Sequence, residues 1–133
     1  MGLIAGRTPS SIKPAVLVVE RNLDLLWLFR RAVERSVGEA CDVVALATGA
    51  DACAQISLRS VPLAIVAEKL IDMEGVAVVA TIKQRSPRTR IVLTSTNPTL
   101  AAEAAAWRSG INHYLKKPFA LETIMEIVSE TLS

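Results

Sequence analysis

Charged and hydroxyl side chains stand at the ends of short apolar runs in this 133-residue chain. The pairs are Glu20-Arg21, Ala67-Glu68, Thr94-Ser95 and Lys117-Pro118, with the turn Thr48-Gly49 ending a fifth run. If the runs are parallel strands, these ends meet at the sheet edge where open α/β proteins bind ligands. Two cations and a hydroxyl gathered there could hold a small anion. Alternatively, Glu20 could form an ion pair with Arg21 or Lys117 and fill the space.

The five apolar runs have the composition of buried strands. Strands covered on both faces are near-continuous runs of Val, Ile, Leu and Ala, as in a parallel sheet. The predicted strands are Ala15–Val19, Asp42–Ala47, Leu63–Ala67, Arg90–Thr94 and Asn112–Leu115. If these five strands are parallel, the charged and hydroxyl residues at their carboxyl ends lie along one edge of the sheet.

Helical stretches are predicted after each strand. The first is capped by Asn22 and stopped by Gly38, and Trp27 falls off its apolar stripe, which suggests a partly exposed residue with an anchoring role. The others are predicted over 50–58, 76–85, 98–109 and 121–132, with Asn97-Pro98 opening the fourth. The order is (βα)5, which predicts a doubly wound parallel sheet between two helical layers.

Composition narrows the function classes. The chain is 51% hydrophobic and 21% charged, typical of one packed domain, with residues 1–13 predicted as a tail and 14–133 as the domain. A net charge of +2 does not favour nucleic-acid binding. We interpret the basic cluster Lys83, Arg85, Arg88 and Arg90 as a solvated face.

Cys41 and Cys53 have no metal or redox spacing, so we expect reduced thiols in a cytoplasmic protein.

Four segments resemble the receiver domain of two-component response regulators, the CheY-like family. They are Val18–Arg21, Asp72–Gly75, Val92–Ser95 and Gly110–Phe119, and the last is the most distinctive, with Tyr114 on a strand and Lys117-Pro118 after it. The resemblance covers about residues 14–132. It implies a flavodoxin-like (βα)5 sheet with strand order 2-1-3-4-5 and a role in phosphorelay signalling.

The resemblance also shows what this chain lacks. In the family, an aspartate eight residues before the glycine of the third loop accepts a phosphoryl group, and here that position is Ala67. Two acidic residues that help to hold Mg²⁺ correspond to Glu20 and Arg21. Thr94 and Lys117 match the residues that contact the phosphoryl oxygens, and Tyr114 matches the aromatic residue that reports activation.

We therefore expect a pseudo-receiver, which is not an enzyme, has no catalytic residue or metal site, and binds Mg²⁺ weakly or not at all. Its degenerate acceptor pocket comprises Glu20, Arg21, Ala67, Glu68, Thr94, Lys117 and Pro118. Glu68 is an alternative acceptor, but it is one residue out of register, so strand alternation turns it to the other face. A surface pairing of Glu68 with Lys69 or Arg21 is the expected arrangement.

The expected role is that of a phosphorylation-independent interaction module. By the resemblance, partners dock on the face made by the fourth helix, fifth strand and fifth helix, roughly residues 101–132, and the partner would be a histidine kinase or a second copy. Tyr114, Trp107 and His113 are the candidate switch and interface residues, with His113 expected at the surface. A phosphorelay receiver using Glu68, and a binder of a small anion in the vacated pocket, are the two alternatives. No nucleic-acid or membrane contact is expected.

Overall fold

Five parallel strands form one sheet in the structure, a computed structural model that describes residues 12–133. Their order is β2-β1-β3-β4-β5, which confirms the predicted doubly wound arrangement. The strands are β1 (Ala15–Val19), β2 (Asp42–Leu46), β3 (Leu63–Ala67), β4 (Arg90–Ser95) and β5 (His113–Lys116). The predicted tail, residues 1–13, falls almost entirely outside the described range.

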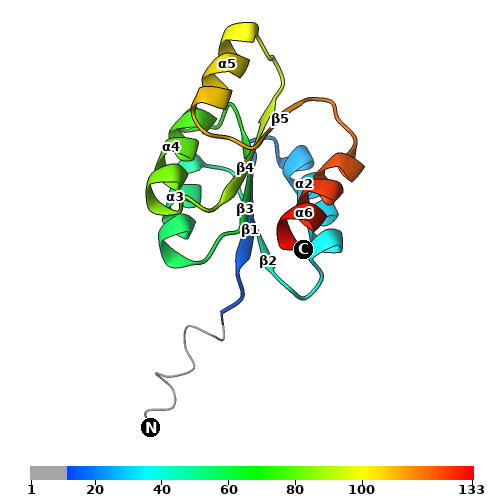
Figure 1. Ribbon diagram of the computed structural model, residues 1–133. Helices are drawn as coiled ribbons and strands as arrows, with labels where there is room; N and C mark the ends of the chain where they lie inside the picture. Colours follow the sequence, from blue (N-terminus) through cyan, green and yellow to red (C-terminus); the bar gives the residue numbers. More distant parts are fainter. Residues whose placement is uncertain (1–11) are drawn as a thin grey trace.

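Two helical layers cover the sheet (Figure 1). One layer consists of α2 (Leu23–Val37) and α6 (Leu121–Leu132), and the other of α3 (Gly49–Leu58), α4 (Gly75–Arg85) and α5 (Leu100–Arg108). Because strand residues alternate between faces, Val16 and Val18 enter the core under α2 and α6, whereas Leu17 and Val19 enter the other. Among residues 12–133, no helix is long and apolar enough to cross a membrane.

The helix that leads away from β1 begins and ends where its sequence predicts. The Asn22 side chain accepts hydrogen bonds from the backbone N–H groups of Asp24 and Leu25, which satisfies two of the free donors of the first turn. Gly38 ends the helix with a φ of 55°, a conformation that glycine adopts without a steric penalty. The Asn22 cap therefore fixes the position of the backbone directly after the Glu20-Arg21 pair.

The helix after β4 begins later than predicted. Asn97-Pro98 was the expected start, but α5 begins at Leu100, and the Thr99 hydroxyl accepts a hydrogen bond from the Ala102 N–H. Threonine is also a good N-cap, and Thr99 is two residues closer to the Ala-rich segment than Asn97 is. Residues 96–98 therefore stay in the loop that borders the site.

Two smaller expectations also need correction. The fifth strand is shifted by one residue, because the Asn112 side chain accepts from the Ile91 N–H and its own N–H donates to the Ile91 carbonyl before the strand begins. Trp27 is 58% exposed, so it does not anchor the helix in the core. The guanidinium carbon of Arg31 lies 5.4 Å from the centre of its ring, a cation–π contact on the helix surface.

Gly75 brings the loop after β3 back against the end of that strand. Its N–H donates to the Glu68 carbonyl at 2.7 Å. A Cβ at this position would overlap the carbonyl oxygen of Ala67, so only glycine allows the close approach. The loop therefore returns to the strand exit that holds residues 67 and 68.

Candidate functional site

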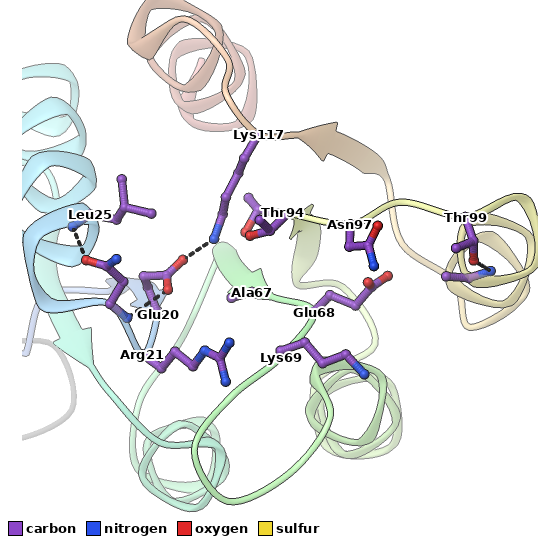
Figure 2. A pocket seen from close by; sticks show the side chains of 13 residues that line it. Glu20, Arg21, Leu25, Ala67, Glu68, Lys69, Thr94, Asn97, Thr99 and Lys117 are labelled. Carbon is purple, nitrogen blue, oxygen red and sulfur yellow. Dashed lines mark hydrogen bonds and ion pairs between the residues drawn. The ribbon is translucent and has the colours of Figure 1, made fainter.

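A pocket of about 640 Å³ lies at the carboxyl edge of the sheet. Its walls come from the residues that follow β1, β3, β4 and β5, and from the start of α2 and α5 (Figure 2). The volume falls in the range of small-ligand sites. The lining residues are Glu20, Arg21, Asn22, Leu25, Ala67, Glu68, Lys69, Thr94, Thr96, Asn97, Thr99, Ala102 and Lys117. Most of the pocket residues expected from the sequence are thus brought together.

Ala67 lies at the centre of the pocket (Figure 2). It is the last residue of β3, is 3% exposed, and pairs in register with Thr94 on β4. Its side chain is a methyl group, which cannot act as a nucleophile or bind a metal. The central position of the strand edge is therefore chemically inert.

Glu20 and Lys117 form a buried ion pair across the pocket. The Lys117 Nζ donates to Glu20 Oε1 at 2.5 Å, and the side chains are 13% and 3% exposed. The other carboxylate oxygen accepts from the Asn22 N–H at 2.9 Å. Both oxygens of Glu20 are thus engaged within the protein. The Lys117–Pro118 peptide bond, which follows β5, is cis.

Glu68 is held by hydroxyl groups. Ser95 Oγ donates to Oε1 at 2.9 Å, and Tyr114 Oη donates to Oε2 at 3.2 Å. The expected pairing with Lys69 or Arg21 is wrong, because Lys69 pairs instead with Glu74 at 2.8 Å. Ser95 is the last residue of β4 and Tyr114 is the second residue of β5, so only the strand order could have linked them to Glu68.

The Tyr114 hydroxyl has a raised pKa. Partial burial raises the pKa of Tyr114 above its ordinary value of 10.0. The Ser95 hydrogen bond lowers this pKa, and the negative charge of Glu68 raises it. Because burial and a neighbouring carboxylate both disfavour the phenolate, Tyr114 stays a neutral hydrogen-bond donor over the ordinary pH range.

Arg21 is the one pocket cation without an ion-pair partner among residues 12–133. It follows β1 directly and is exposed. Figure 2 shows its side chain extending beneath Ala67. In the part of the chain that the structure describes, no group of three or more His, Cys, Asp or Glu residues is placed to hold a metal.

The loop after β3 carries a carboxylate that sequence reasoning missed. Asp72 accepts hydrogen bonds from the N–H groups of Gly49 and Ala50, at 2.8 and 2.9 Å. These two bonds to the start of α3 lower the pKa of Asp72. Asp72 thereby ties the loop beside the pocket to a neighbouring helix N-terminus, where negative charge is favoured.

The three candidate switch and interface residues do not form one cluster. Tyr114 contacts Glu68 at the pocket side, whereas His113 lies on the opposite face of β5 in a groove beside α6. His113 was expected at the surface, but it is half-buried, and its Nε2 has no hydrogen-bond partner within residues 12–133. Trp107 lies on α5, 47% exposed, and its Nε1 donates to Glu103 at 3.3 Å.

Comparison with known proteins shows consistent similarity. The family described as "Response regulator receiver domain" matches residues 16–129. The chain is 24% identical over 118 residues to the DNA-binding transcriptional regulator NtrC of Escherichia coli (strain K12), covering 89% of this chain and 24% of NtrC. It therefore spans about a quarter of the length of that curated relative.

Solved structures give the same fold. A CheY-like receiver domain from Methanospirillum hungatei JF-1 superposes with a TM-score of 0.81 at 22% identity, covering 90% of this chain and 94% of the other. The receiver domain of an HD domain-containing protein from Pseudomonas fluorescens Pf-5 gives a TM-score of 0.80 at 25% identity, with coverages of 90% and 94%.

Proposed function

This chain belongs to the response regulator receiver domain family, and we propose that it signals through protein–protein contacts without being phosphorylated. The observation that carries the proposal is the methyl group of Ala67 at the end of β3. The receiver phosphorylation reaction needs a carboxylate at that point to attack the phosphoryl donor. Removing the nucleophile removes the reaction, while the fold and its surfaces are retained.

Glu68 is a poor substitute acceptor. Both its oxygens accept hydrogen bonds, from Ser95 at 2.9 Å and from Tyr114 at 3.2 Å. An oxygen that attacks phosphorus must be free and aligned with the leaving group. We therefore propose that Glu68 has a structural role in linking Ser95 of β4 and Tyr114 of β5 to the end of β3.

The pocket does not suit Mg²⁺, and we propose that this domain works without it. Magnesium ions favour sites with carboxylate and water oxygens. Here the oxygens of Glu20 accept from Lys117 and from the Asn22 N–H, and the next residue is the cation Arg21. A divalent cation would have to displace the Lys117 ammonium group and would be repelled by the guanidinium group.

The surface formed by α5, β5 and α6 is the proposed interaction face. On α5 only Ala106 is buried, whereas Leu100 is 90% exposed and Trp107 is 47% exposed. A helix that shows apolar residues to solvent and an exposed tryptophan is typical of an interface, where aromatic residues dominate the binding energy. We propose a protein of a signalling pathway as partner, either a histidine kinase or a second copy of this chain.

Two further aspects belong to the proposal. We place the domain in the cytoplasm, a reducing compartment in which Cys41 and Cys53 remain the free thiols that the structure has. We propose no direct contact with nucleic acid, because the net charge of +2 is small and the basic residues near β4 lie on a solvated face.

Incubation with acetyl phosphate and Mg²⁺ tests the loss of phosphorylation. The intact mass of the wild-type protein is expected to stay unchanged. A receiver domain with its acceptor aspartate serves as the positive control. A phosphoryl adduct that disappears in Glu68→Gln would overturn the proposal and establish Glu68 as the acceptor.

The interaction face is tested by a pull-down with the wild type and with Leu100→Ser/Trp107→Ser. Loss of the captured partner, or of self-association, is expected in the double variant. Leu58→Ser is the matched control, because Leu58 is 71% exposed on α3, away from α5. Equal binding by the wild type and by both variants would contradict the assignment of this face.

A further inference from the structure

We propose that the pocket over Ala67 binds a small oxyanion of the phosphate class non-covalently, with Arg21 supplying the positive charge. This inference builds on the proposed loss of covalent phosphorylation. It requires neither a nucleophile nor a metal ion, since the anion is held only by ionic and hydrogen-bonding contacts. It adds a ligand to a domain that otherwise acts through its surfaces.

The pocket has space for such a ligand at its centre. An alanine at position 67 leaves the middle of the strand edge with a methyl group only, and the surrounding cavity measures about 640 Å³. In Figure 2 the side chains of Glu20, Arg21 and Lys117 lie around the space next to Ala67. A carboxylate at this position would repel an anion, and its absence removes that repulsion.

The charges of the lining favour an anion. The lining carries three cations, Arg21, Lys69 and Lys117, and two carboxylates, Glu20 and Glu68. Lys117 is matched by Glu20 at 2.5 Å, and Lys69 is matched by Glu74 at 2.8 Å. That leaves Arg21 as the lining cation with no ion pair in the described residues 12–133.

The carboxylate of Glu68 is directed away from the centre. Its oxygens accept from Ser95 and Tyr114, which belong to β4 and β5. Figure 2 shows Glu68 on the Asn97 side of the pocket, whereas Arg21 lies on the side of β1. The guanidinium group and the carboxylate thus face different parts of the cavity, and an anion beside Arg21 avoids Glu68.

Thr94 provides an independent indication. The residue is 1% exposed and lines the pocket, and its hydroxyl makes none of the side-chain hydrogen bonds found among the described residues. The fully buried side-chain atoms without a partner among residues 12–133 are Arg59 Nε and His113 Nε2, so the Thr94 hydroxyl is not sealed off and can donate to a molecule in the pocket. An oxyanion would accept from the Thr94 hydroxyl and from the guanidinium fork, which is shaped for two oxygens of one phosphate.

Titration with inorganic phosphate tests the proposal. Thermal unfolding and isothermal calorimetry are followed at constant ionic strength, with sodium chloride replacing phosphate in the reference. We expect a saturable stabilisation by phosphate. Arg21→Gln is expected to weaken binding at least about tenfold, because a charge-assisted hydrogen-bonded contact is lost. Thr94→Val, which keeps the side-chain shape, is expected to weaken it several-fold.

Arg35→Gln is the matched control. Arg35 is exposed on α2, lies outside the pocket, and the substitution removes the same charge. It is expected to bind phosphate as the wild type does. Equal weakening in Arg21→Gln and Arg35→Gln, or stabilisation no larger than that by chloride, would overturn the proposal.

A titration with glycerol phosphate distinguishes a site for phosphate monoesters from a site for free inorganic phosphate. Binding of both glycerol phosphate and inorganic phosphate supports a site for phosphate monoesters. Binding of inorganic phosphate alone supports a site for the free anion. If phosphate does not bind while acetyl phosphate also leaves the mass unchanged, this inference fails and the proposed function stands.

Discussion

Lys117 and Glu20 lie 97 residues apart in the sequence and form an ion pair of 2.5 Å at the sheet edge. The pair joins the exits of β1 and β5, which are separated in the sheet by β3 and β4. The side chain of Lys117 is 13% exposed and that of Glu20 is 3% exposed, so both charges are largely withdrawn from water. Each charge is therefore stabilised mainly by the opposite charge of its partner and little by water.

Removal of the lysine should destabilise the fold strongly. In Lys117→Met the Glu20 carboxylate stays buried and loses its cation, which typically costs about 3 kcal/mol of unfolding free energy. Urea denaturation measures the change. Addition of Glu20→Gln to Lys117→Met should recover part of the loss, because the uncompensated charge disappears.

The control for this prediction is a surface pair. Lys69 and Glu74 are 62% and 56% exposed and their charged atoms are 2.8 Å apart, so Lys69→Met should lower the free energy of unfolding far less than Lys117→Met does. If Lys117→Met costs no more than Lys69→Met, the buried pair does not stabilise the pocket as described.

Tyr114 should ionise above its ordinary value of 10.0, mainly because of its partial burial. It is the only tyrosine in the chain, so the ultraviolet absorbance of tyrosinate reports this residue alone. Glu68→Gln removes a neighbouring negative charge and should lower the pKa of Tyr114 relative to the wild type. A midpoint at or below the ordinary value would contradict the buried, hydrogen-bonded position.

The shift at Tyr114 also predicts a loss of stability at high pH. Its pKa is raised in the folded state, so the unfolded chain releases this proton at a lower pH. The folded state then holds more protons, and stability falls as pH rises above about 10, the ordinary tyrosine pKa. Tyr114→Phe should show a smaller decrease in unfolding free energy over this pH range.

Gly75→Ala should destabilise the protein, although alanine is a better helix former. The added Cβ would overlap the backbone carbonyl of Ala67, which cannot move without distorting β3. We expect a loss of about 2 kcal/mol, as for other overpacked positions. In Gly49→Ala the Cβ meets the flexible side chain of Met73, so a smaller change in unfolding free energy is expected. An unchanged midpoint for Gly75→Ala would contradict this packing.

Much of the fold could be predicted because local signals agree with the tertiary structure. The continuous apolar runs Ala15–Val19 and Leu63–Ala67 are fully buried strands, as their composition indicates. The start of α5 was missed because Asn97-Pro98 and Thr99 offer competing start signals within three residues. Local propensity cannot rank such neighbours when the helix buries only Ala106.

The sequence predicts which residues belong to the site better than it predicts the contacts between them. Strand ends of a parallel sheet must meet, so Glu20, Ala67, Thr94 and Lys117 could be placed together from the sequence. The partners of Glu68 depend on the side-chain rotamers of residues in β4 and β5, for which the sequence carries no direct signal. Asp72 was missed for a similar reason, since its bonds to Gly49 and Ala50 join the loop after β3 to the start of α3.

Restoring two carboxylates tests whether the remaining phosphorylation machinery still works. Ala67→Asp returns a nucleophile to the end of β3, opposite Thr94. Arg21→Asp removes the cation that repels Mg²⁺ and adds a second carboxylate beside Glu20. We expect the double variant to gain partial labelling by acetyl phosphate in the presence of Mg²⁺, measured by intact mass. Labelling should remain incomplete because Lys117 stays paired with Glu20.

The single variant Ala67→Asp is the control for the double variant. It has the nucleophile but keeps Arg21, so metal binding is disfavoured and little labelling is expected. Omission of Mg²⁺ from the reaction should abolish labelling of the double variant. If Ala67→Asp alone is labelled as fully as the double variant, then Arg21 does not exclude the metal. In that case the acceptor position alone separates this domain from a phosphorylated receiver.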